Sequence, residues 1–150
     1  MMFYANGDIY EGGWLDGERS GEGRYIYKNK IINDFESSLQ NENELYVGEW
    51  RNDKKNGLGT LKMSNGDEYK GEWFENKKNG TGVYTFSNGD NFEGIFANDK
   101  RNGKGSYSWV DGRCFEGTWK DDVIDGKGVY LDREGKKIEG EFRKGRLIST

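Results

Sequence analysis

The sequence predicts an all-β protein: a thin, elongated antiparallel meander of successive β-hairpins with no helical domain. Three observations predict it: a motif that recurs every 23 residues, alternation of aromatic residues and glycines within each copy, and Asn-Gly or Asp-Gly pairs between copies. In an array with a period of this length, each unit packs only on its neighbours. We therefore expect the function to lie in a surface rather than in an enclosed pocket.

Each copy of the motif places an aromatic residue, a glycine and a second aromatic residue at alternate positions. One copy has Tyr69, Gly71 and Trp73, followed by the Gly-x-Gly pair Gly80 and Gly82. The first position recurs every 23 residues, at Tyr46, Tyr69, Phe92, Phe115 and Ile138, and an upstream copy has Tyr10, Gly12 and Trp14. Alternate residues share one face of a strand. Since glycine in a strand marks close approach of a bulky group, rings of one strand are expected to lie over glycines of the next.

Two kinds of connection alternate along the chain. Asn-Gly and Asp-Gly pairs supply the positive φ angles of a tight two-residue hairpin turn, which predicts such turns at Asn6-Gly7, Asn65-Gly66, Asn88-Gly89 and Asp111-Gly112. The other connection is charged, as in residues 75–79, and is expected to be longer. The sequence contains no proline and no stretch with helical periodicity.

We expect residues 1–150 to form a single array of about five full repeats with partial repeats at both ends. Residues 28–44 form a polar insertion between the first and second full repeats. Insertions in repeat proteins map to surface loops, so this segment is either a solvated loop or part of a binding surface. The unpaired strand edge expected at each end predicts self-association through edge strands or a longer array.

The composition limits the classes of partner and the cellular compartment that we expect for this protein. The net charge is −4 with 33% charged residues, so the chain has no overall bias towards nucleic acid. Cys114 is the only cysteine, and the first residues lack the pattern of a secretory signal, which favours the reducing environment of the cytoplasm. No apolar run approaches transmembrane length.

The sequence has few of the residue types and motifs that catalysis requires. The sequence has no histidine, which removes the usual general base and the commonest metal ligand. Gly21-x-Gly23 lacks the third glycine and the helix of a dinucleotide fingerprint. Carboxylates recur at equivalent positions, without the contrasting environments that an acid–base pair needs. We predict no enzyme activity, no catalytic or metal-binding residue and no cofactor; an array fused to a catalytic domain is a third, distant interpretation.

The phrase Tyr69-Lys70-Gly71-Glu72-Trp73, followed by Lys78-Asn79-Gly80-Thr81-Gly82, resembles the MORN repeat (membrane occupation and recognition nexus). The resemblance implies an elongated, twisted antiparallel sheet with an aromatic-lined groove. It also implies a scaffold of the cytoskeleton or the axoneme of cilia, whose partner is a helix or a neighbouring scaffold subunit; some members are linked to phosphoinositides. The chain departs from the pattern by size-preserving changes at Phe96, Ile138, Phe142, Leu61 and Met63.

Two surfaces are candidate sites. The first is the aromatic–glycine face, which is either a partner-binding groove or internal packing, and its candidate residues are Tyr46, Trp50, Tyr69, Trp73, Tyr84, Phe92, Phe96, Tyr107, Phe115 and Trp119. The second is a basic loop ridge, which is either a solvated edge or a site for acidic phospholipid on a membrane surface, formed by Lys54, Lys55, Lys77, Lys78, Lys100 and Arg101. Binding through the ridge should weaken with salt, whereas binding of an apolar helix should not.

Overall fold

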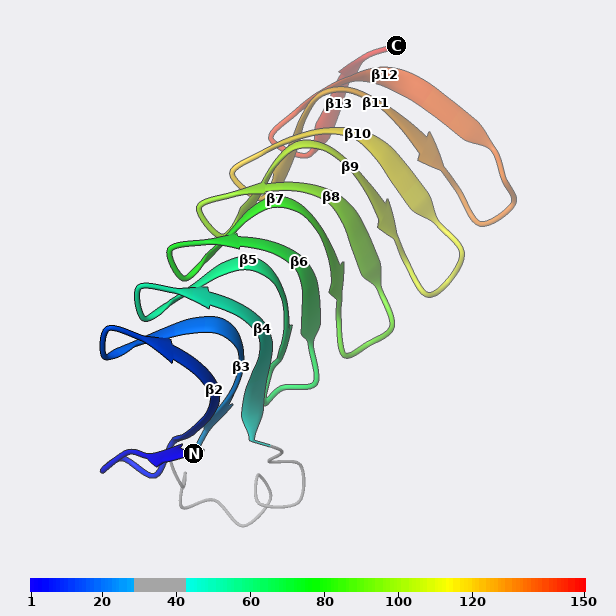
Figure 1. The fold of residues 1–150 in the computed structure, drawn as a ribbon. Helices are drawn as coiled ribbons and strands as arrows, with labels where there is room; N and C mark the ends of the chain where they lie inside the picture. Colours follow the sequence, from blue (N-terminus) through cyan, green and yellow to red (C-terminus); the bar gives the residue numbers. More distant parts are fainter. Residues whose placement is uncertain (29–42) are drawn as a thin grey trace. The chain divides into compact units, whose positions relative to one another are not determined.

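The computed structural model describes residues 1–28 and 43–150, so residues 29–42 of the predicted insertion lie outside the described residues. Within the described ranges there are thirteen strands and no helix, which confirms the predicted all-β fold class. The chain divides into two compact units, Met1–Asn76 and Lys77–Thr150. Each unit is an antiparallel meander of successive hairpins, in which every strand pairs with the next along the chain (Figure 1).

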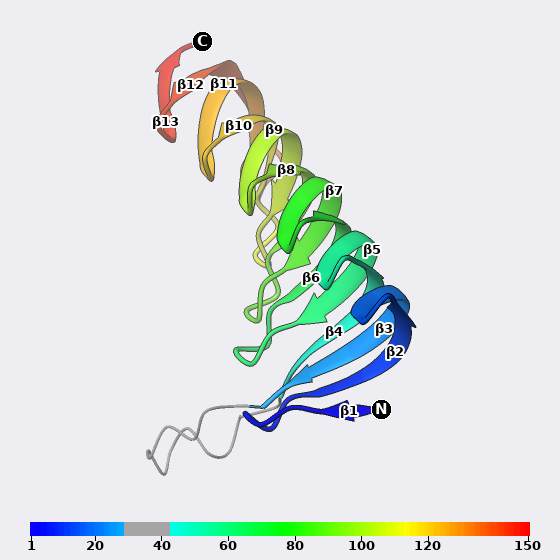
Figure 2. The same ribbon diagram turned by 60° about the vertical axis from the view of Figure 1, so that its left-hand side comes forward.

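Unit 1 contains six strands: β1 (Met2–Phe3), β2 (Ile9–Leu15), β3 (Glu18–Tyr27), β4 (Glu44–Arg51), β5 (Lys54–Lys62) and β6 (Glu68–Phe74). Unit 2 contains seven strands: β7 (Lys77–Thr85), β8 (Asn91–Ala97), β9 (Lys100–Ser108), β10 (Cys114–Lys120), β11 (Val123–Leu131), β12 (Lys137–Arg143) and β13 (Arg146–Ser149). Figure 2 shows the strands of each unit side by side in chain order, and most of them are strongly bent.

The motif glycines align across the strands of each unit. In unit 2 each pairs directly with the next, in the order Gly82, Gly94, Gly105, Gly117, Gly128 and Gly140. In unit 1 the corresponding stripe runs through Gly12, Gly23, Gly48, Gly59 and Gly71. A one-residue slip would move every side chain to the other face, so the stripe fixes which residues share a surface.

The two glycines of a Gly-x-Gly pair have different roles. The first has a positive φ angle, +116° at Gly103 and +100° at Gly57, and lies beside a β-bulge where the register of the hairpin shifts. Bulges bend and twist a strand, which accounts for the bend of the hairpin. The second glycine is needed for space: a Cβ atom on Gly105 would lie 2.3 Å from Cζ of Phe92. The expectation that rings cover glycines therefore holds for the second glycine.

The two kinds of turn are the reverse of those predicted. At Ser64-Asn65-Gly66 only the glycine has a positive φ angle, and the amide of Met63 donates to Asp67 across the loop at 2.8 Å, so the loop has three residues. The side chain of Asn65 accepts the amide of Asp67 at 2.9 Å; asparagine is favoured here because its side chain stabilises the turn.

The tight two-residue turn instead lies at the charged connection that we expected to be longer. In unit 2 Ala97 pairs with Lys100, and both intervening residues are left-handed, with φ of 49° at Asn98 and 71° at Asp99. Positive φ at both central residues defines the hairpin turn whose twist matches that of the strands. Asn and Asp tolerate this conformation without glycine. The prediction that tight turns lie at the Asn-Gly pairs was therefore wrong.

In four of the tight turns the second residue bonds to the hairpin before it. The amide of Asp122 donates to the carbonyl of Arg101 at 3.0 Å, and Oδ1 of Asp122 accepts the amide of Arg101 at 2.9 Å. Arg19 and Asp53 form the same pair of bonds in unit 1. Equivalent pairs join Lys55 to Asn76 and Lys78 to Asp99. Asp53, Asn76, Asp99 and Asp122 at this edge thus connect successive hairpins.

A buried carboxylate anchors the three-residue loop after β7. Asp90 is only 7% exposed and accepts hydrogen bonds from the hydroxyl of Tyr107 at 2.8 Å and the amide of Val110 at 3.0 Å. These hydrogen bonds, of which the one from Tyr107 has the largest effect, hold the pKa of Asp90 below its usual range. Burial and the neighbouring Asp90 raise the pKa of Tyr107 to about 12.

This geometry predicts an acid-dependent loss of stability. Because the folded pKa of Asp90 is depressed, its contribution is complete above the unfolded value of about 3.9 and is lost as the pH falls through the folded value. The urea midpoint of unfolding should therefore decrease between about pH 5 and pH 2.5. The variant Asp90→Asn should show a smaller decrease over that range; an equal slope in both proteins would assign the acid sensitivity to other carboxylates.

Candidate functional site

The ten aromatic residues predicted to bind a partner are mostly in the core. Eight of them are at most 5% exposed, and Tyr84 and Tyr107 are half-buried. In unit 2 the ring of Phe92 lies between Phe96, at 5.4 Å, and Trp119, at 5.2 Å, both edge-on. In unit 1 Tyr46 lies in the same way between Trp50 and Trp73. Each repeat is thus packed against the next by perpendicular rings, an arrangement that aromatic pairs favour.

Hydrogen bonds fix these rings to the backbone. Nε1 of Trp119 donates to the carbonyl of Gly105 at 3.2 Å, and Nε1 of Trp50 donates to that of Gly23 at 3.2 Å. The hydroxyl of Tyr46 donates to the carbonyl of Glu49 at 2.8 Å. Burial, with Glu49 and Glu22 nearby, raises the pKa of Tyr46, so this hydroxyl remains a donor. The rings and their polar atoms are already satisfied within the fold.

The six residues of the predicted basic ridge divide into two sets. Lys55, Lys78 and Arg101 are half-buried and extend over rings: Nζ of Lys55 lies 4.7 Å from the ring centre of Trp73, and Cζ of Arg101 lies 4.7 Å from that of Trp119. A cation at this distance is attracted by the ring face. The exposed members are Lys54, Lys77 and Lys100. Half of the predicted ridge is therefore occupied in holding the repeats together.

An open groove of about 960 Å³ lies on unit 2. Its floor is the backbone of the glycine stripe at Gly105, Gly117, Gly128 and Gly140. None of the ten predicted aromatic residues lines it. Its side chains alternate along the strands with the ring positions, so they project from the opposite face of the sheet. The rings of Phe92 and Phe115 fill the space behind the floor, as their close approach to Gly105 and Gly128 shows.

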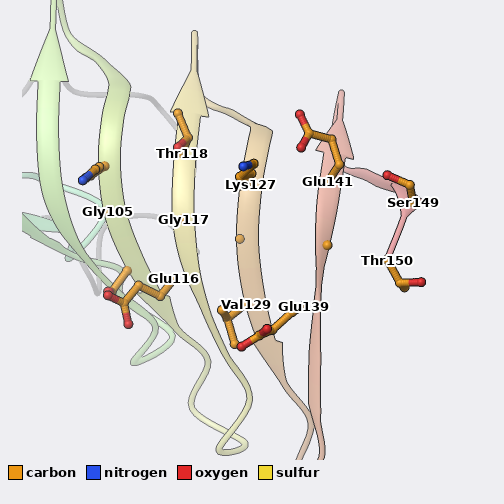
Figure 3. A pocket seen from close by; sticks show the side chains of 14 residues that line it. Gly105, Glu116, Gly117, Thr118, Lys127, Val129, Glu139, Glu141, Ser149 and Thr150 are labelled. Carbon is orange, nitrogen blue, oxygen red and sulfur yellow. The ribbon is translucent and has the colours of Figure 1, made fainter.

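Two rows of side chains form the walls of this groove (Figure 3). The first wall consists of Lys104, Thr118, Lys127, Glu141 and Ser149. The second wall consists of Ser106, Glu116, Val129 and Glu139, which are direct neighbours across β9 to β12. Apart from Val129 the wall side chains are polar or charged, and they stand on either side of a backbone floor, an arrangement that can receive an elongated ligand with matching polar groups.

The described ranges contain neither a metal-binding cluster nor a membrane-spanning helix. No group of three or more His, Cys, Asp or Glu side chains there is arranged to hold a metal ion. Nor does any helix within those ranges have the length and apolar character needed to cross a membrane. The groove and the loop edge are thus the two surfaces of interest.

The repeat of this chain is similar to a known family of repeats. The family model of the MORN repeat matches residues 10–30, 46–68, 69–91, 92–112 and 115–137. The chain belongs to the MORN repeat family. It is also similar to MORN repeat-containing protein 3 of Xenopus laevis, with 39% identity over 59 residues, which is 39% of this chain and 22% of the relative.

Among solved structures, the chain is similar to the SAS-4 (dCPAP) TCP domain of Drosophila melanogaster, whose structure is a complex with a proline-rich motif of Ana2 (dSTIL). The TM-score is 0.47 and the identity 17%, over 93% of this chain and 81% of that chain. The curated relative is much longer than the matched segment, since the match spans about a fifth of its length.

Sequence reasoning missed the groove because its lining lies at the variable positions of the MORN repeat. The wall residues are those that separate the motif positions, such as Glu116 between Phe115 and Gly117. Most of these positions differ from repeat to repeat, although glutamate recurs at positions 93, 116 and 139. The signal that was present is the alternation itself, because side chains between ring positions must project from the other face.

Proposed function

We propose that this MORN repeat chain is a non-catalytic protein-interaction module that binds a segment of a protein partner in the groove of unit 2. The observation that carries the proposal is the glycine floor between two rows of side chains. Glycine in a strand permits another backbone to approach closely, and the buried rings behind the floor hold it in place. MORN repeat proteins are commonly interaction modules and typically non-catalytic scaffolds.

The ring face is a weaker candidate for the partner site. A binding hot spot needs side chains that a partner can contact, yet Trp73 and Trp119 are 4% and 5% exposed. The proposal that these residues act as hot spots remains a prediction. The groove offers backbone and polar side chains without any rearrangement of the core.

Binding of acidic phospholipid by the loop ridge is the second candidate. Its support is limited to the exposed lysines Lys54, Lys77 and Lys100, because their neighbours extend over rings. Each basic residue near an anionic surface contributes about 1 kcal/mol. Vesicle binding that disappears at physiological salt, and in the variant Lys54→Glu/Lys77→Glu/Lys100→Glu, would support this function instead.

We extend the proposal to the location of the complex, the cytoskeleton or a cilium within the cytoplasm, because the resemblance to MORN proteins implies such assemblies. A fluorescently tagged chain expressed in ciliated cells tests it. Accumulation along the axoneme or on cytoskeletal filaments supports the location, and uniform cytosolic fluorescence contradicts it.

Blocking the groove tests the proposed function directly. Ser106→Trp places a large ring above the glycine floor, because Ser106 lies in the second wall between Glu93 and Glu116. The amount of partner protein captured from native extract should be at least about tenfold lower with this variant than with the wild-type chain. The control is the triple lysine variant of the ridge, which should capture it normally.

Both variants should first be shown to melt near the wild-type temperature, so that a loss of binding is not a loss of fold. Retention of the partner by Ser106→Trp together with its loss in the ridge variant would overturn the groove proposal. Quantitative mass spectrometry of the captured proteins provides the measurement for all three chains.

A further inference from the structure

We infer that the groove accepts an α-helix that carries Lys or Arg at every seventh residue along one flank and acidic residues on the other. This inference rests on the proposed function and names the chemistry of the partner. It comes from the charged residues of the two walls, which are spaced regularly and differ in sign.

Three glutamates define the acidic row: Glu116 on β10 and Glu139 on β12 line the second wall, and Glu93 on β8 continues the same row past Ser106, outside the groove lining. Direct cross-strand pairing places them in one line, with Ser106 and Val129 between them. All three are exposed. They lie two strands apart, so their spacing is about 9.6 Å. A row of one sign at a fixed spacing favours a partner with basic groups at the same spacing.

Little in the fold neutralises this row. Glu93 and Glu116 form no ion pair with any residue in the ranges 1–28 and 43–150. Glu139 pairs with Lys137 at 2.6 Å, but both side chains are more than half exposed. Exposed pairs of this kind contribute little, so a partner can replace Lys137 at small cost.

The spacing of the acidic row selects a helix over an extended chain. Residues seven apart on a helix lie on one face and about 10.5 Å apart along the axis, within about 1 Å of the row's spacing. In an extended strand, residues on one side lie about 6.6 or 13 Å apart, and neither value fits. The difference that remains for a helix is small compared with the reach of Lys and Glu side chains.

The opposite wall sets the other flank of the helix. Lys104 on β9 and Lys127 on β11 also lie two strands apart, with Thr118 between them, and neither forms an ion pair within the described part of the chain. Acidic residues of the helix would face these lysines. Glu141 follows Lys127 in this wall, directly opposite it on the next strand and before Ser149, so the helix should carry no acid at that end. The glycine floor favours small residues on the helix face that lies against it.

This charge pattern belongs to unit 2. The row at the same motif position in unit 1 holds Glu11, Val47 and Lys70, joined by the equivalent pairing. The MORN repeats therefore share a fold while their groove positions differ in charge. Glu11 and Glu18 are exposed glutamates of unit 1 and provide a control with the same change in net charge.

The test uses the whole chain, labelled with ¹⁵N, and synthetic helical peptides of about three heptads. One peptide carries Lys at every seventh residue and Glu on the opposite flank, and a second has the same composition in scrambled order. We expect the first to shift the amide resonances of Gly105, Gly117 and Gly128 and to bind at least about tenfold more tightly than the second. Raising the salt to about 500 mM should weaken it, because the attraction is between exposed charges.

Charge reversal provides the decisive comparison. Glu93→Lys/Glu116→Lys should bind the basic peptide about tenfold less tightly and prefer a peptide with Glu at the seven-residue positions. Glu11→Lys/Glu18→Lys should bind as the wild type does. Equal binding of the ordered and scrambled peptides, or undiminished binding by Glu93→Lys/Glu116→Lys, would overturn the inference.

The native partner separates this inference from the function on which it rests. If Ser106→Trp loses the partner and Glu93→Lys/Glu116→Lys keeps it, groove binding stands and the basic helix is wrong. If both variants keep the partner, the groove itself is not the site and both proposals fail. Loss of the partner in both variants, with retention by Glu11→Lys/Glu18→Lys, supports both.

Discussion

Replacing Gly105 with alanine is expected to lower the free energy of unfolding by about 3 kcal/mol, the upper part of the range for overpacking a core. The new Cβ atom would lie 2.3 Å from Cζ and 2.5 Å from Cε2 of Phe92. That ring is fully buried and is held between Phe96 and Trp119, so it has no space to move into. Urea unfolding followed by tryptophan fluorescence measures the change.

Gly112→Ala is the matched control in the same unit. No atom lies within 4 Å of the Cβ that it would add, but its φ angle is +99°, so the cost is backbone strain alone, about 1 kcal/mol. Combining Gly105→Ala with Phe92→Leu should show a favourable coupling, because the smaller side chain makes room. Gly105 has no positive φ angle, so equal effects of the two glycine substitutions would show that the ring of Phe92 can make room for a Cβ atom.

Replacing Trp119 with alanine is expected to cost about 3–5 kcal/mol, as for other buried aromatic residues. The side chain is 5% exposed, contacts Phe92 and Phe115 edge-on, and has Arg101 over its face. Its loss would leave a cavity between two repeats and remove the ring beneath Arg101, whose guanidinium would keep its ion pair with Asp122. Thermal unfolding measured by calorimetry, beside the urea midpoint, reports the loss.

Trp119→Phe distinguishes volume from hydrogen bonding. Phenylalanine keeps most of the ring contacts but leaves the carbonyl of Gly105 without its donor, at a cost of about 1 kcal/mol. The repeats already hold Phe96 and Phe142 at this position, so the fold should persist. If Trp119→Phe kept its stability and yet lost the partner, the ring face would be the binding site instead of the groove.

The fold could be predicted from the sequence because the same alternation of rings and glycines recurs in every repeat. Alternation of rings and glycines determined the faces of the strands, and the observed contact of Phe92 with Gly105 follows from it. The turns could not be assigned in the same way. Asn-Gly pairs occur both in two-residue turns and in three-residue loops. The two-residue turn at Asn98-Asp99 has left-handed residues but contains no glycine from which it could have been predicted.

The candidate site was harder to predict because it depends on what the rings leave uncovered. Their motif positions gave no indication that Trp73 and Trp119 would be almost fully buried by their own neighbours. Nor could the sequence show that Lys55 and Arg101 extend over these rings. The groove is formed by the positions between the motif residues, and their charges have meaning only once the register places Glu93, Ser106 and Glu116 in line.

Photo-crosslinking from single positions tests the central claim most directly. A benzophenone amino acid is introduced at Val129 in the groove wall, at Tyr84 among the rings, or at Lys100 on the loop edge, and each chain is irradiated with native extract. We expect a crosslinked partner from Val129, absent when Ser106→Trp is also present, and none from Tyr84 or Lys100. A partner crosslinked from Tyr84 or Lys100 but not from Val129 would contradict the central claim.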